Sequence, residues 1–61
     1  MELVDQSGAA DYLQVPTRTL EAWRHTGRGP RYSRIGKHVR YRVADLERFV
    51  EERSVEPRQA S

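Results

Sequence analysis

Basic side chains are concentrated in the middle of this 61-residue chain. Between Pro16 and Arg42, eight arginine and lysine residues stand against one acid, Glu21, which gives the segment a net charge of +7. The rest of the chain has three arginines and eight acids, a net charge of −5, so the total of +2 conceals a strong segregation. Cations gathered on one face attract an anionic partner, although solvated surface charge is the simpler alternative.

The first half of the basic segment has side chains suited to reading DNA bases. Arg18 can pair bidentately with guanine, and Glu21 can accept a hydrogen bond from the cytosine amino group. Alternatively, Glu21 pairs with His25 or orients Arg18. Thr17 suits a phosphate or a thymine methyl group, and Arg24 suits a phosphate. The predicted base-reading group is Thr17, Arg18, Glu21, Ala22, Arg24 and His25.

The second half of the segment has side chains suited to the DNA backbone. We expect phosphate contacts here, with one arginine inserted into a narrow minor groove. In the alternative interpretation, Arg40 or Arg42 pairs with acids of a helix predicted at about residues 44–53 and has a structural role. The predicted group is Arg28, Arg31, Arg34, Lys37, His38 and Arg40.

Other chemistries have little support in this sequence. There is no cysteine, and His25 and His38 lack further ligands, so we expect no metal site. No nucleophile–base spacing and no glycine-rich phosphate loop is evident, so we expect no enzyme activity and no cofactor. Trp23 could stack on a base, but its position three residues after Leu20 favours the core.

Two short helical patterns that meet at a tight turn would position the base-reading group. Ala9, Ala10 and Leu13 mark the apolar stripe of a first helix, predicted over about residues 6–13 with Asp5 as its N-cap. Leu20 and Trp23 mark the second helix, which begins at Pro16 or Thr17 and ends near residue 25, before Gly27. Val15 plugs the corner and Gln14 occupies the turn. This pattern is typical of a helix-turn-helix.

A hairpin and a third helix would carry the backbone-contacting group and complete the core. Tyr32–Ile35 and Val39–Val43 resemble strands, and Gly36 and Lys37 between them predict a two-stranded hairpin whose Val39 and Tyr41 face the helices. Leu3 and Val4 should also pack on the core. A C-terminal helix is expected at about Ala44–Arg53, with its core stripe at Leu46, Phe49 and Val50 and with Asp45 and Arg53 complementing its dipole.

The predicted fold is therefore an α+β winged helix-turn-helix. It comprises a helix-turn-helix, a two-stranded β-hairpin wing and a C-terminal helix. Residues 1–53 form one domain, and residues 54–61 form a disordered tail. No signal peptide and no apolar run of about 20 residues is visible, so we expect a cytoplasmic protein.

With these residues in place, the sequence resembles the small winged helix-turn-helix domains of the excisionase and MerR-like group. The resemblance covers residues 3 to 52. Gln14 stands where the family often has glycine, and Pro16 where it often has serine. The matching segments are Ala9-Ala10, Tyr12-Leu13, Val15, Thr19 to Arg24, Gly27 to Pro30, Ile35 to Lys37, Val39 to Tyr41, Asp45-Leu46 and Phe49-Val50.

The resemblance implies a phage-type excisionase, a recombination directionality factor without enzyme activity. Such proteins bind tandem sites on double-stranded DNA beside an attachment site, bend the DNA, and direct a tyrosine- or serine-type integrase toward excision. The host would be a phage-infected or lysogenic bacterium. A small transcriptional regulator is the alternative within DNA binding. A protein-interaction module such as an antirepressor is the alternative of another class.

Acidic side chains on the predicted C-terminal helix suggest self-association on DNA. They would meet the basic wing of a neighbour in a head-to-tail contact, while the protein stays monomeric in solution. In the alternative, they only keep the helix soluble. The residues concerned are Glu47, Glu51 and Glu52.

Overall fold

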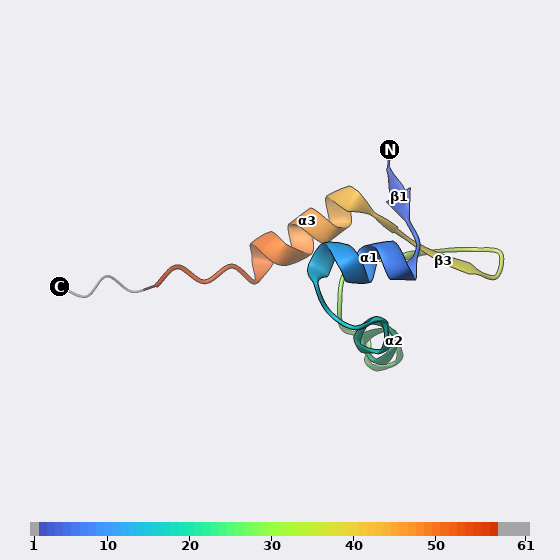
Figure 1. Cartoon of the computed structure of the whole chain (residues 1–61), viewed down its shortest axis with the longest axis horizontal. Coiled ribbons are helices and arrows are strands. Elements are labelled where there is room, and N and C mark those ends of the chain that lie inside the picture. Colours follow the sequence, from blue (N-terminus) through green and yellow to red (C-terminus); the bar gives the residue numbers. More distant parts are fainter. Residues whose placement is uncertain (1, 58–61) are drawn as a thin grey trace.

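The computed structural model describes residues 2–57, in which three helices pack together beside a small antiparallel sheet whose hairpin projects away from them (Figure 1). This arrangement confirms the predicted α+β winged helix-turn-helix fold. The elements in chain order are β1 (Leu3–Val4), α1 (Gln6–Leu13), α2 (Thr17–Thr26), β2 (Ser33–Ile35), β3 (His38–Arg42) and α3 (Val43–Glu52).

Local signals set the ends of α1 and α2. The Asp5 carboxylate accepts a hydrogen bond from the Gly8 amide (2.8 Å), which caps α1 as predicted. Gln14 ends α1 in the left-handed conformation with φ 58°, which L-residues other than asparagine and aspartate seldom adopt. Pro16 is the N-cap of α2, and Gly27 ends that helix with φ 73°. The ambiguous start of the second helix is thereby resolved to Thr17.

The sheet has a third strand that the sequence did not reveal. Its order is β1-β3-β2, with Val4 opposite Tyr41 and Leu3 opposite Arg42. Because neighbouring residues of a strand point to opposite faces, Val4 packs on the core while Leu3 stays 42% exposed. The prediction that Leu3 packs on the core was therefore wrong. Gly8 makes room for β1, since a Cβ there would lie 3.0 Å from the Cβ of Val4.

The core lies where α1, α2, α3 and β3 meet. Trp23 covers one end of it, with its ring centroid 5.4 Å from that of Phe49. The loop after α2 crosses closely over Trp23, because a Cβ on Gly29 would lie 2.9 Å from the indole. The innermost residues of the core are Ala9, Ala10, Leu20, Tyr41 and Leu46. Around them pack Val4, Leu13, Val15, Trp23 and Val39.

The C-terminal helix differs from its prediction in two respects. Val50 was expected in the core but is 48% exposed, because the buried face of α3 is the one that carries Leu46 and Phe49. Arg53 lies just past the helix, and its guanidinium sits 3.7 Å from the Phe49 ring centroid. Residues 54–57 form no helix or strand, and residues 58–61 of the predicted tail lie outside the described residues.

Candidate nucleic-acid interface

The outward face of α2 has the composition that the sequence predicted. Leu20 is fully buried and Trp23 half-buried, and together they fix the inward face. Arg18 is exposed, and within residues 2–57 its side chain has no hydrogen-bond or ion-pair partner. Its five donors are therefore available to a ligand. The exposed side chains of this face are Thr17, Arg18, Glu21, Ala22 and His25.

Arg24 differs from the other predicted residues of α2, because the fold itself uses its guanidinium. Its Nη1 donates to Oε1 of Gln6 (2.7 Å) and to the hydroxyl of Tyr41 (3.2 Å). The guanidinium carbon also lies 5.9 Å from the ring centroid of Tyr32. These three contacts give the half-buried Arg24 a structural role. A phosphate contact would have to use the remaining N–H donors of its guanidinium.

Gln6, the first residue of α1, contacts the exposed face of α2, and sequence reasoning missed it. Its Nε2 donates to Oε1 of Glu21 (3.1 Å) and, at 3.4 Å, to the carbonyl oxygen of Thr17. Gln6 thus connects the first turn of α1 to the exposed face of α2. Its partners lie 11 to 18 positions away in the chain, so no local pattern could have indicated the contact.

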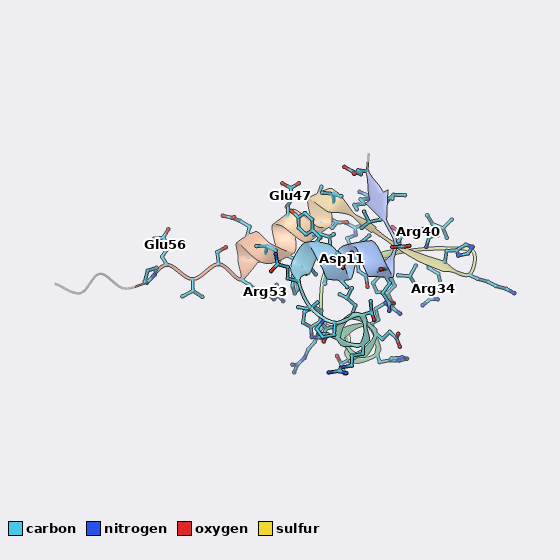
Figure 2. The ribbon with its side chains drawn as sticks, in the orientation of Figure 1. Asp11, Arg34, Arg40, Glu47, Arg53 and Glu56 are labelled. Atoms are coloured by element: carbon cyan, nitrogen blue, oxygen red, sulfur yellow. The ribbon has the colours of Figure 1, made fainter. Side chains whose placement is uncertain are left out.

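The wing, formed by β2, β3 and the turn at Gly36-Lys37, divides its basic residues between two faces. Arg34 is paired with Val39, which packs on the core, so Arg34 lies on the inner face. Arg40 is paired with Ser33 on the outer face, where its Nη1 donates to the carbonyl oxygen of Val39 (2.9 Å). Figure 2 shows Arg34 on the side of the wing toward α2 and Arg40 on the opposite side.

The tip of the wing is exposed. Lys37 lies in the turn, and His38 begins β3. Next to them Ile35, an apolar residue, is 52% exposed.

Among residues 2–57, Arg40 and Arg42 do not form the pairs with acids of α3 that the alternative interpretation required. The ion pair found in this part of the chain is Arg53–Glu52 (3.9 Å).

The loop from Gly27 to Tyr32 brings further cations to the C-terminal end of α2. Arg28 and Arg31 are exposed there, beside the half-buried Arg24. These three arginines line a shallow hollow of about 280 Å³ together with Tyr32. A hollow of this charge is suited to a phosphate group.

A family model described as a helix-turn-helix domain matches residues 7–54, most of the chain and every element from α1 to α3. The chain belongs to this helix-turn-helix family. It is therefore a small DNA-binding protein, as the exposed α2 and the basic wing indicate. A comparison with curated proteins finds no match.

Four of the nine acids of this helix-turn-helix protein lie on α3. Glu47 and Glu51 are exposed, and Glu52 is exposed in its pair with Arg53. Glu47 points away from α2 in Figure 2. The predicted basic and acidic groups thus occupy different parts of the surface.

Two further properties of the described residues bear on function. Within residues 2–57 there is no group of three or more histidine, cysteine or acidic side chains placed to hold a metal ion. In the same part of the chain, no helix has the length and apolar character needed to span a membrane.

Proposed function

We propose that this protein is an excisionase-like architectural DNA-binding protein. It binds tandem sites near a phage attachment site, bends the DNA and directs integrase-mediated recombination toward excision. The observation that carries DNA binding is the exposed face of α2, where Arg18 has no side-chain partner among residues 2–57, flanked by basic residues of the loop and wing. The excision role rests on the resemblance to the excisionase group over residues 3 to 52.

In this proposal α2 enters the major groove. Arg18 pairs with a guanine and Glu21 accepts from a cytosine amino group. Thr17, Ala22 and His25 line the same face. The arginine hollow of the loop and the inner face of the wing then follow the backbone, with Arg34 and Lys37 nearest the DNA. His38 and Arg40 lie on the outer face, so we assign them a smaller share of the affinity.

The proposed partners are the DNA, an integrase of the tyrosine or serine type, and a second copy on the adjacent site. The acidic face of α3, with Glu47, Glu51 and Glu52, would meet the basic wing of the neighbour. Such a head-to-tail contact does not close into a dimer. Exposed ion pairs contribute only about 0–1 kcal/mol each, so the protein should be monomeric without DNA. The role places the protein in the bacterial cytoplasm.

Footprinting on the attachment region of the element that encodes the protein tests the proposal. Protection of two or more repeats in the same orientation supports it, as does excision by the integrase that depends on the protein. Protection at a promoter with no effect on excision would make the protein a transcriptional regulator instead.

The salt dependence of binding tests the interaction with DNA itself. If about six phosphates are neutralised, log K should fall against log salt with a slope near −5. A flat response would end the DNA-binding proposal and favour a protein-interaction module such as an antirepressor.

A further inference from the structure

The side-chain amide of Gln6 on α1 lies between two charged side chains of α2, Glu21 and Arg24. It donates from Nε2 to Oε1 of Glu21 (3.1 Å) and accepts at Oε1 from Nη1 of Arg24 (2.7 Å). The orientation of the amide is determined by its partners, because a guanidinium only donates and a carboxylate only accepts. Reversing the amide would set like groups against each other at both contacts.

Glu21 and Arg24 are three residues apart on one helix, a spacing at which opposite charges commonly pair directly. Within residues 2–57 no such pair forms between them, and the amide bridges them instead. Glu21 therefore keeps an oxygen, Oε2, that no hydrogen bond in the described residues uses. A direct pair with Arg24 would draw this carboxylate along the helix toward a half-buried partner.

The bridge is anchored in the core on its other side. Arg24 also donates to the hydroxyl of Tyr41, which is only 1% exposed and lies in the central strand. Gln6 is itself half-buried. The position of the Glu21 carboxylate is thus tied through two side chains to β3, and it does not depend on the free rotation of an exposed glutamate.

We propose that Gln6 is a specificity-determining positioning residue for this DNA-binding face. It holds Glu21 so that the free oxygen accepts a hydrogen bond from the amino group of one cytosine in the major groove. This rests on the proposed function, since it requires α2 to read DNA. Gln6 itself touches no base, and its effect passes through Glu21.

The test uses Gln6→Met, which keeps the length of the side chain and removes its hydrogen bonds with Glu21, Arg24 and the Thr17 carbonyl oxygen. Affinity is measured for the footprinted site, for the site with each base pair substituted in turn, and for non-specific DNA. We expect Q6M to weaken discrimination about tenfold at one base pair, the same one affected by Glu21→Ala. Non-specific affinity and the salt slope should stay unchanged. Ser7→Ala, at an exposed neighbour on α1, is the matched control.

A second pair of variants separates positioning from folding. Gln6→Glu still offers an acceptor to Arg24 but sets a negative charge against Glu21, so it should keep the thermal midpoint and lose the same discrimination. Adding Q6M to E21A should cause no further loss. An equal loss of affinity at every base pair, or full discrimination in both Q6M and Q6E, would overturn the inference. If the wild-type protein itself fails to bind DNA, the proposed function and the inference fall together.

Discussion

Two arginines of α2 show how environment divides residues of one type between binding and stability. Arg18 is exposed with no partner among the described residues, whereas Arg24 is half-buried and donates to Gln6 and Tyr41. Each hydrogen bond to a charged group contributes roughly 1.5–3 kcal/mol to the stability of the fold. Removing one partner also leaves the remaining buried groups without a hydrogen bond, which adds to the loss. The same substitution should therefore weaken DNA binding at Arg18 and lower the stability of the fold at Arg24.

We expect Arg18→Ala to weaken specific binding by about 5- to 150-fold, the range for one good bidentate base contact. Its unfolding free energy should change by less than about 0.5 kcal/mol, as at other exposed sites. Arg24→Ala should instead lower the thermal midpoint by several degrees, since about 1 kcal/mol corresponds to roughly 4–8 °C in a domain of this size. Circular dichroism melts and binding titrations check both. A melting point of R24A equal to that of R18A would contradict the structural role of Arg24.

Among the elements, the wing is a sheet ribbon with two distinct faces, and its pairing decides what each residue can touch. Arg34 shares the inner face with Val39 and lies toward α2, whereas Arg40 lies on the outer face. A duplex in contact with α2 is therefore closer to Arg34. Arg34 is opposite Val39, and Arg40 follows Val39 on β3. Because neighbouring residues of β3 point to opposite faces, the two arginines lie on opposite faces of the wing.

We expect Arg34→Ala to weaken binding to all DNA sequences and to reduce the magnitude of the salt slope by about 1, as for the loss of one phosphate contact. Arg40→Ala is the matched control and should change the slope less. A larger effect of R40A than of R34A would show that the outer face meets the DNA.

The loop that joins α2 to the wing depends on a close approach to Trp23. Gly29 has φ 88° and lies against the indole, whereas Gly27 has φ 73° and has nothing within 4 Å of where a Cβ would be. Both positions require a backbone conformation that costs an L-residue about 1–2 kcal/mol. Only Gly29 also lacks space for a side chain.

We expect Gly29→Ala to be more destabilising than Gly27→Ala, because the loop must move off Trp23 or strain against it. The unfolding free energies of the two variants should differ by about 1–3 kcal/mol, the usual cost of overpacking. Denaturant unfolding monitored by tryptophan fluorescence measures it. Equal destabilisation by the two variants would show that the loop shifts freely.

At the scale of the whole molecule, charge is segregated between α3 and the loop and wing. Glu47 and Glu51 are exposed on α3, while the loop and wing carry the cations. A row of identical molecules on tandem sites could place these surfaces against each other. The contact would act only when DNA holds both copies at high local concentration.

We expect charge reversal at Glu47 and Glu51 to reduce cooperativity on two adjacent sites and leave single-site affinity similar. Two charge reversals raise the net charge and strengthen non-specific DNA binding, so the control makes the same change at Glu2 and Glu56, which are also exposed. Gel-shift titrations on one-site and two-site DNA measure both quantities. Unchanged cooperativity, or an equal loss in the control, would contradict the head-to-tail contact.

Features that depend on near neighbours in the chain could be predicted from the amino-acid sequence. Local chemistry and periodicity predict the Asp5 cap, the end of α2 at Gly27, the stripes of α1 and α2, and the two-residue turn of the wing. Charge segregation also needs no structure to be seen.

The contacts between residues of distant segments became known only from the fold. It added β1 to the sheet, left Leu3 and Val50 exposed, and divided Arg34 from Arg40. It also placed Gln6 between Glu21 and Arg24. Periodicity says which face of an element is apolar, but the angle and distance at which two elements pack decide which polar side chains touch. That geometry arises from the whole core, so the contact of Gln6 with the two charged side chains of α2 became visible only in the fold.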